Sequence, residues 1–574
     1  MLNPNSKRRL LPDDTIFSQL VQCAIEFDGP AFCDPDYEVT ADHRQLIHDV
    51  LQMRERIYET IPPLSFDDSG LLREENMFIL LLAPNGYEFV VGCLAILSVG
   101  GAVVPLASSI LPEEALYFFG QCQSELLVTG SKALDVASSC QEYAQGHGFP
   151  TVKILPIEKT RKQLCRMPMK DIVDRSLTIP PSRPGLVIFT SGSTGPPKGV
   201  VLPRACFYPG PLRKEEGWIC PAHRHVHWAG GATQLIHMVL EGVRLDFIPH
   251  GSSPAVFWEH IRQRRVTLLA VIPMLLVQLK TYFETQLMKL PPQQLREYVE
   301  GARHIRVFRV GSAMPAPETM QFWERILGRP VHTGYGSTEG GGIISIACGS
   351  RHASSIGKPL PDTCLKLSEG DHGEILLKSP RMLLRYLNNE EATRAVFDED
   401  GFYHTGDLAH LEGDEYIFDG RASSDFIRFN GYKVSILELE HALMSLECVT
   451  EAYVVPVADA EYGEQAAAII RPCSGFKQQT ISLQSVREDL SKMLPIYMLP
   501  TMLLVLSADE VLPQSSSGKI SRATLQKKYF NHAGLDAHKT EVCKVDSKLK
   551  SAGYRPWDWA GLQRTAAGSS ISQK

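Results

Sequence analysis

Residues Gly185–Gly199 read GLVIFTSGSTGPPKG, and this stretch combines the two patterns that decide the fold. Its first part, LVIFT, is a short apolar run rich in β-branched residues, which is typical of a buried strand. Its second part, TSGSTGPPKG, follows without a break and contains only Gly, Ser, Thr, Pro and one Lys, which is typical of a loop. We therefore expect a buried strand that ends directly in a polar, glycine-rich loop.

Short apolar runs and helical stretches alternate around this segment, from about Phe78 to Pro273. The runs are MFILLLA, ELLVTG, GLVIFTSG and VTLLAVIP, and each ends at or beside Gly, Pro or Ser. Strands that alternate with helices predict parallel sheets of the α/β class. Ligands of such sheets bind at the loops beyond the carboxyl ends of the strands, so the loop after LVIFT is the first candidate binding site.

The sequence changes character after Arg421. Before this residue, HIRVFRVGSA, EILLKS and EYIFDGR predict a second sheet region. After it, DFIRFNGYKVSILELEHALMSL predicts a hairpin that leads into an amphipathic helix, and VTEAYVVPVAD and EQAAAIIRP predict two more strands. Because 574 residues exceed what one hydrophobic core accommodates, we expect an N-terminal domain over residues 1–422, a small α+β domain over 423–530 and a surface tail over 531–574.

The composition is that of a folded protein and argues against nucleic-acid binding. Apolar residues make up 44% and charged residues 21% of the chain, and the formal net charge is −7, so no basic field covers the molecule. The thirteen cysteines include no CxxC pair and no Cys/His cluster with the spacing of metal ligands. We therefore expect reduced thiols, as in a cytosolic protein.

One apolar segment, Phe89–Ala107, is long enough to be mistaken for a transmembrane helix. It reads FVVGCLAILSVGGAVVPLA, and Gly100, Gly101 and Pro105 interrupt it. We interpret it as a helix up to Val99, a glycine turn and a short buried strand of a soluble core. The N-terminus lacks the apolar run of a secretory signal and the C-terminus lacks a peroxisomal tripeptide, so a cytoplasmic location is expected.

The glycine-rich loop has the chemistry of a polyphosphate site. Its glycines let backbone N–H groups approach an anion, its hydroxyls add donors, and its lysine adds a positive charge. It is not a Walker A loop, because Gly199 stands where that motif requires Ser or Thr. The alternative is a flexible surface loop. The candidate phosphate-binding residues are Thr190, Ser191, Gly192, Ser193, Thr194, Gly195 and Lys198.

TSGSTGPPKG resembles the phosphate-loop signature of the adenylate-forming superfamily, which includes acyl- and aryl-CoA synthetases, nonribosomal-peptide adenylation domains and beetle luciferases. Further motifs of that family recur in its order from about Phe78 to Arg522. The resemblance implies a large N-terminal domain with stacked, mostly parallel sheets and a distorted β-barrel subdomain, plus a small mobile α+β C-terminal domain. It also implies ATP, Mg²⁺ and coenzyme A as the partners of the reaction.

The segment Gly334–Glu339 reads GYGSTE and resembles the family's nucleotide-binding motif. The resemblance implies that Tyr335 stacks on adenine, that Thr338 binds the α-phosphate and that Glu339 holds Mg²⁺, which prefers oxygen ligands. The alternative is a helix N-cap box at Ser337 or Thr338. The remaining nucleotide-site candidates from this motif and from the family segment upstream of it are Gly311, Ser312, Ala313, Gly334, Gly336 and Ser337.

Two later motifs complete the resemblance. In YHTGDL and EYIFDGR, Asp407 matches the residue that accepts hydrogen bonds from the ribose, and Arg421 matches an arginine close to it. Tyr403 stands where the family usually has Trp. In PQSSSGKISR, Lys519 matches the lysine that contacts the α-phosphate and the substrate carboxylate. The alternatives are that Asp407 is only an aspartate in a turn, that Arg421 is a surface arginine and that Lys519 is a solvated lysine.

The sequence departs from the family beyond Arg421. The run ASSDFIRFNGYK is one residue longer than in many members, so the hinge is either Ser423 or Ser424. Arg428 and Lys433 stand where relatives carry groups that serve the thioester step, although solvated hairpin charges are the alternative.

Residues near the expected acyl pocket give a looser match. His227, with His225 and Trp228, falls where relatives place a gating His or aromatic residue, and a core histidine is the alternative. HVHWAGG and GRASSDFIRFNGYKVSILELE are similar to malonyl-CoA-synthetase-like members. Arg306 or Arg309 would then pair with a second carboxylate, or both are charges at a strand edge.

The resemblance implies a two-step reaction. The carboxylate of a small-molecule acid, whose identity the sequence leaves open, attacks the α-phosphate of ATP and releases pyrophosphate. A thiol then displaces AMP from the acyl-AMP. No carrier module follows Lys519, so CoA is the expected acceptor. A separate carrier protein is the first alternative, and a catalytically silent nucleotide-binding relative is the second.

Overall fold

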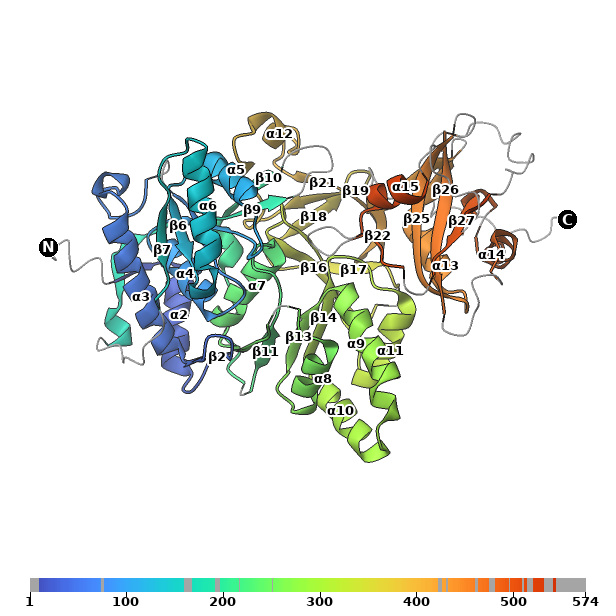
Figure 1. Cartoon of the computed structure of the whole chain (residues 1–574), viewed down its shortest axis with the longest axis horizontal. Coiled ribbons are helices and arrows are strands. Elements are labelled where there is room, and N and C mark those ends of the chain that lie inside the picture. Colours follow the sequence, from blue (N-terminus) through green and yellow to red (C-terminus); the bar gives the residue numbers. More distant parts are fainter. Residues whose placement is uncertain are drawn as a thin grey trace.

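The structure is a computed structural model that describes residues 10–73, 77–158, 168–190, 197–215, 217–249, 251–350, 352–421, 426–429, 432–459, 463–473, 481–494, 496–507, 510–513, 520–530 and 540–542. In Figure 1 a seven-stranded sheet with its helices lies at one end of the molecule and a C-terminal sheet at the other. A nine-stranded sheet lies between them. The predicted α/β class is confirmed.

The seven-stranded sheet contains the strand that ends in the glycine-rich loop. Its order is β20 (Arg385–Tyr386), β10 (Lys198–Pro203), β9 (Pro184–Thr190), β5 (Ala102–Pro105), β4 (Phe78–Leu82), β6 (Leu126–Thr129) and β7 (Lys153–Pro156). Strands β9, β5, β4, β6 and β7 are parallel, whereas β10 and β20 extend the edge in antiparallel fashion. The carboxyl end of β9 therefore lies at the edge of the sheet where ligands bind.

The nine-stranded sheet begins parallel and ends antiparallel. Strands β13 (Leu268–Val271), β14 (Val307–Gly311) and β15 (His332–Ser337) are parallel. The antiparallel part continues with β16 (Gly342–Cys348), β17 (Ser355–Pro359), β22 (Glu415–Arg421), β21 (Tyr403–Glu412), β19 (His372–Lys378) and β18 (Cys364–Leu367). These strands stand where a distorted barrel was expected, but among the described residues they form an open sheet that does not close.

Two smaller sheets complete the N-terminal part. One is ordered β11 (Ile219–Ala222), β12 (Arg244–Phe247), β2 (Phe32–Asp34) and β3 (Val39–Ala41). The other pairs β1 (Leu11–Asp13) with β8 (Val173–Thr178). Helices of this part are α2 (Thr15–Glu26), α3 (His43–Thr60), α4 (Tyr87–Ser98), α5 (Pro112–Cys122), α6 (Leu134–Gly146), α7 (Ala229–Leu240), α8 (Pro254–Arg262), α9 (Pro273–Thr285), α10 (Pro292–His304), α11 (Pro317–Leu327) and α12 (Glu390–Arg394).

The apolar segment Phe89–Ala107 folds as predicted. Every residue of α4 is buried, a turn follows at Gly100, and the buried strand β5 comes next. Leu81, on the neighbouring strand β4, packs against this helix at Gly92. Across the described ranges, no helix combines the length and the apolar character that crossing a membrane requires.

The C-terminal part is a separate sheet with its own apolar core. The predicted hairpin is present as β23 (Phe426–Phe429) and β24 (Tyr432–Ser435), and the predicted helix as α13 (Ile436–Met444), whose N-cap is Ser435. The predicted strands are β25 (Val449–Asp459) and β26 (Gly463–Pro472), which pair with each other. The remaining elements are β27 (Met502–Val505), β28 (Thr540–Val542), α14 (Leu483–Leu490) and α15 (Arg522–Tyr529).

Strand β28 belongs to the segment predicted as a surface tail. It pairs antiparallel with β27, and the Glu541 carboxylate accepts a hydrogen bond from the backbone of Leu483 at 2.6 Å. At least this part of the tail is therefore an edge strand of the C-terminal sheet.

Candidate active site

The glycine-rich loop connects the two strands of the β9–β10 hairpin. Thr190 and Lys198 are directly opposite each other, and the Thr190 hydroxyl donates to the Lys198 carbonyl at 3.4 Å. The hairpin therefore brings both ends of the loop together at the carboxyl end of β9. The loop residues Ser191, Gly192, Ser193, Thr194 and Gly195 lie outside the described residues.

Tyr386 links Lys198 to Glu339. Its hydroxyl donates to Glu339 Oε1 at 3.2 Å, and Lys198 Nζ lies 5.6 Å from the centroid of its ring. Burial, with the neighbouring Glu339 charge, raises the pKa of Tyr386, so its hydroxyl remains a donor at neutral pH. Tyr386 lies on β20, which pairs with β10. No local sequence pattern indicates Tyr386, because its role depends on the pairing of Tyr386 with Val200, a residue far away in the chain.

Tyr335, Asp407 and Arg421 form one hydrogen-bonded cluster. The Tyr335 hydroxyl donates to Asp407 Oδ2 at 2.7 Å, and Arg421 Nε donates to Asp407 Oδ1 at 2.8 Å. Asp407 is only 5% exposed, whereas the Arg421 side chain is 49% exposed. Burial and the adjacent Asp407 raise the pKa of Tyr335 well above its usual value. Three residues that the resemblance assigned to nucleotide binding therefore meet at one point.

The GYGSTE motif forms the end of a strand and a tight turn. Strand β15 ends at Ser337, β16 begins at Gly342, and the Ser337 hydroxyl accepts a hydrogen bond from the Gly340 backbone at 3.0 Å. The alternative of a helix N-cap at this motif is therefore wrong. A Cβ atom at Gly336 would lie 2.1 Å from the Gly342 carbonyl oxygen, so the hairpin requires glycine there. Thr338 lies in the turn, where its carbonyl accepts from Gly341.

The GSA segment lies at the carboxyl end of β14, beside the nucleotide motif. Gly311 pairs with Gly334 in parallel register, and a Cβ atom at Gly311 would lie 2.9 Å from the Gly334 carbonyl oxygen. Ser312 has a φ of 80°, which is strained for a residue other than glycine. Ser312 and Ala313 are exposed. Strained backbone beside a binding motif is typical of a functional site.

Two arginines, Arg224 and Arg309, lie near the GSA segment, and neither has an ion-pair partner among the described residues. Arg224 Nη1 donates to Gln234 Oε1 at 2.9 Å, and Arg224 Nη2 donates to Ser312 Oγ at 3.4 Å. Burial and the nearby charge of Arg309 lower the pKa of Arg224 to about 10. The buried Nε atoms of Arg224 and Arg309 have no hydrogen-bond partner among the described residues. Uncompensated buried cations are costly, so such a pair is typical of a site for an anion.

Arg309 and Arg306 occupy different positions. The Arg309 side chain packs against Gly334, with Cδ 3.5 Å from the position of a Cβ there. The charge of Glu241 interacts with Arg309, but the Glu241 carboxylate is already paired with Arg213 at 2.8 Å. Arg306 instead precedes the amino end of β14, where it lies over the Trp218 ring and 3.5 Å from Glu215. Of the two arginines named from the sequence, only Arg309 lies near the nucleotide motif.

The histidine segment before α7 forms a group of aromatic rings. The centroid of His225 lies 5.0 Å from that of His227 and 4.6 Å from that of Trp228. Arg224 directly precedes this segment and was not singled out from the sequence. The sequence feature that could have indicated Arg224 is its position as a charged residue shortly after the buried strand β11.

Several predicted residues cannot be placed in the site. Lys519, Ser423 and Ser424 lie outside the described residues. The backbones of Arg428 and Lys433 are directly opposite each other in the β23–β24 hairpin, and their side chains lie outside the described part of the chain. Their roles stay predictions. Among the described residues, no group of three or more His, Cys, Asp or Glu side chains is arranged to hold a metal ion.

Comparison with known proteins gives matches over most of the chain. A model of the AMP-binding enzyme family matches residues 67–387, and a model of the AMP-binding enzyme C-terminal domain matches residues 438–519. Acyl-CoA ligase oryP of Aspergillus oryzae is 33% identical over 539 residues, which cover 91% of this chain and 93% of that protein. A malonate–CoA ligase of Arabidopsis thaliana is 29% identical over 488 residues, which cover 79% and 78% of the two chains.

The fold agrees as well. The crystal structure of ATP-bound MatB from Rhodopseudomonas palustris matches with a TM-score of 0.70 at 20% identity, covering 89% of this chain and 99% of MatB. At that identity the match shows the fold. The family model covers more than half of the chain, and oryP is similar over nearly all of it. The chain therefore belongs to the AMP-binding enzyme family, and within it to the acyl-CoA ligases, which are AMP-forming acid–thiol ligases.

Proposed function

We propose that this chain forms an acyl-AMP from ATP and a carboxylic acid with a second anionic group, and then transfers the acyl group to coenzyme A. The products of the two steps are pyrophosphate, then AMP and the thioester. The observation that supports this proposal most strongly is the Tyr335–Asp407–Arg421 cluster, which joins two distant motifs at the carboxyl end of β15.

The cluster has the chemistry to bind a ribose. A carboxylate has about four lone-pair sites, so Asp407 has acceptor capacity left after Tyr335 and Arg421 have donated to it. Because Asp407 is 5% exposed, water competes little for that capacity. Tyr335 remains neutral and keeps its donor, since its pKa is raised. Both ribose hydroxyls are therefore proposed to bind Asp407.

The phosphates need positive charge, and we assign it to Lys198 and Lys519. Lys198 lies at the base of the loop, and the resemblance implies that Lys519 approaches from the C-terminal domain. A fixed ammonium stabilises the transition state more than the ground state, because charge builds on phosphate and carboxylate oxygens during the attack.

Glu339 fits a role in holding Mg²⁺. This ion is usually bound by one or two carboxylates together with substrate phosphates, and the side chain that contacts Glu339 is the neutral hydroxyl of Tyr386. Its Oε1 accepts from Tyr386, which orients the carboxylate. When bound, the ion would neutralise charge on the phosphates.

The acid is proposed to carry a second anionic group because, in the part of the chain that the structure describes, no carboxylate pairs with Arg224 or Arg309. A second carboxylate beside Ser312 would accept from the guanidinium groups and compensate their charge. Arg309 packs against Gly334, which directly precedes Tyr335 of the cluster, so the proposed acid site and nucleotide site would be neighbours. The name of the malonate–CoA ligase relative is in line with such an acid.

Two other functions are kept as alternatives. A separate carrier protein would replace CoA as the acceptor, and a silent relative would bind the nucleotide without turnover. One observation argues against a catalytically inactive relative. The residues to which we assign a role in the reaction are all present, namely Lys198, Glu339, Asp407 and Lys519.

The test is AMP and pyrophosphate release from ATP and Mg²⁺ over a panel of acids, with and without CoA. Malonate and succinate should turn over in a CoA-dependent way, whereas monomethyl malonate, which has nearly the same size and no second charge, should react poorly. Fatty acids and cinnamates complete the panel. ATP–pyrophosphate exchange that CoA does not affect would favour the carrier protein. Absence of turnover by folded, ATP-binding protein would favour the silent relative.

We also propose a cytoplasmic location, as the sequence predicts. Cell fractionation with an antibody against the chain tests it.

A further inference from the structure

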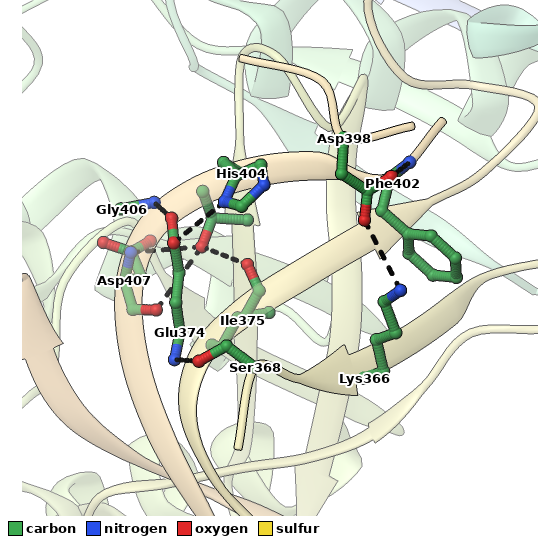
Figure 2. A network of polar contacts seen from close by, with 10 residues as sticks. Lys366, Ser368, Glu374, Ile375, Asp398, Phe402, His404, Gly406 and Asp407 are labelled. Atoms are coloured by element: carbon green, nitrogen blue, oxygen red, sulfur yellow. Dashed lines mark hydrogen bonds and ion pairs between the residues drawn. The ribbon is translucent and has the colours of Figure 1, made fainter. Parts of the chain in front are cut away.

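Strand β21 contains a bulge immediately before the ribose-site aspartate. Leu376 pairs with His404 and Glu374 pairs with Leu408, so Thr405, Gly406 and Asp407 lie opposite the single residue Ile375. Bulges of this kind interrupt the backbone ladder and change the direction in which a side chain points. The Asp407 carboxylate at this bulge accepts hydrogen bonds from Tyr335 and Arg421, and Figure 2 shows the residues of the bulge itself.

The bulge leaves backbone groups without ladder partners, and side chains replace them. The Gly406 N–H donates to Glu374 Oε1 at 2.8 Å, and the Asp407 N–H donates to the Thr405 hydroxyl at 3.1 Å. That hydroxyl donates in turn to the Ile375 carbonyl at 2.8 Å. Gly406 has a φ of 72°, a left-handed conformation that glycine adopts without strain.

Glu374 holds the bulge at two points. While Oε1 accepts from Gly406, Oε2 lies 2.9 Å from Nδ1 of His404, the residue just before the bulge. The Glu374 backbone N–H donates to the Ser368 hydroxyl at 2.9 Å, which fixes the glutamate near the start of β19 (Figure 2). The Glu374 carboxylate therefore connects the residue before the bulge and the central residue of the bulge to the neighbouring strand.

We propose that Glu374 is a positioning residue for nucleotide binding, because it fixes the Thr405–Asp407 bulge and so holds Asp407 in place for the ribose hydroxyls. Glu374 makes none of its hydrogen bonds to the Asp407 carboxylate, so it acts through the backbone. The inference rests on the proposed function in assigning Asp407 to the ribose. Since the ribose is bound equally before and during the reaction, loss of Glu374 should raise KM for ATP and leave kcat nearly unchanged.

The test measures binding of ATP, 2′-deoxy-ATP and 3′-deoxy-ATP by calorimetry to the full chain and to three variants. Glu374→Ala removes the acceptor of Gly406. Glu374→Gln keeps an acceptor oxygen on a side chain of the same length. Glu412→Ala is the control. Glu412 lies on β21, as the bulge does, but at the far end of that strand, and its carboxylate lies 2.6 Å from His352.

Glu374→Ala should weaken ATP binding about tenfold, the value of a charge-assisted hydrogen bond, and should lose much of the preference for ATP over the deoxy analogues. Glu374→Gln and Glu412→Ala should keep the wild-type affinity for ATP and the wild-type preference for ATP over the deoxy analogues. An unchanged preference in Glu374→Ala overturns the inference, and so does an equal loss for all three nucleotides accompanied by a lower Tm. Failure of the wild-type chain to bind ATP at all instead overturns the proposed function.

Discussion

At the scale of single residues, Lys519 is the side chain whose assignment depends wholly on its motif. We expect Lys519→Ala to lower the rate of acyl-AMP formation about 10²- to 10³-fold, because a preorganised charge partner of the transition state is lost. ATP–pyrophosphate exchange measures this step. The control is Lys528→Ala, a substitution on α15 beyond the motif, where the ammonium lies by Tyr529. An exchange rate close to wild type in Lys519→Ala would remove the lysine from the mechanism.

Arg309 is the residue that should decide which acids react. We expect Arg309→Met to lower kcat/KM for a dicarboxylic acid about tenfold to a hundredfold, the loss of one hydrogen bond to a charged group. The value for the monomethyl ester should stay the same or rise. Arg306→Met is the matched control, since Arg306 is three residues away and lies against Trp218. An effect of Arg306→Met as large as that of Arg309→Met would contradict the assignment.

At the scale of elements, a buried histidine joins α3 to α7. His43 is 1% exposed, and its Nε2 lies 3.2 Å from the Val239 carbonyl. Burial lowers the pKa of His43 to about 4. The unfolded chain, with a histidine pKa of about 6.5, binds the proton more tightly than the folded chain does. The associated stability is therefore complete above about pH 6.5 and falls by about 3 kcal/mol as the pH drops toward 4.

We expect His43→Gln to remove much of this acid sensitivity, because glutamine donates to Val239 without titrating. Urea unfolding midpoints at pH 7.5 and pH 5 measure the effect. His147→Gln, at an exposed histidine, serves as the control and should keep the wild-type difference between the two pH values. A wild-type pH dependence in His43→Gln would show that other groups carry it.

The elements themselves could largely be predicted from the sequence. Segments such as α4–β5 and the β23–β24–α13 unit were found because apolar periodicity and glycine turns are local signals. Tyr386 and Glu374 could not be found this way. Their roles arise from strand pairing between β20 and β10 and between β19 and β21, and one sequence does not reveal register across so many residues. The helix-cap alternative at Ser337 shows the same limit, since a Ser-Thr-Glu string is equally compatible with a hairpin turn.

At the scale of the whole molecule, the small C-terminal domain is expected to rotate between the two steps. The domain limits at 422 and 530 stay predictions, and β28 places part of the expected tail within the C-terminal sheet. Rotation about one residue requires that its φ angle changes, and proline fixes φ. A proline at the hinge should therefore preserve acyl-AMP formation and slow thioester formation by about tenfold or more.

Ser423→Pro and Ser424→Pro test this directly. ATP–pyrophosphate exchange reports the first step, and appearance of the acyl-CoA reports the complete reaction. The hinge is the position at which the two rates separate, and the other variant is its control. If neither variant separates the rates, the chain does not rotate about either serine.

If the acid binds as proposed, Arg224 and Arg309 should also exclude some carboxylic acids from the reaction. A long-chain fatty acid that entered the pocket would place methylene groups against Arg224 and Arg309 and would strip water from two guanidinium groups without replacing it. That desolvation penalty opposes the gain from burying the methylene groups, so we expect fatty acids to be poor competitors. Small multivalent anions of the cell would compete instead. The turnover rate should therefore depend on the concentrations of small dicarboxylic acids and phosphate, and hardly on the concentration of long-chain fatty acids.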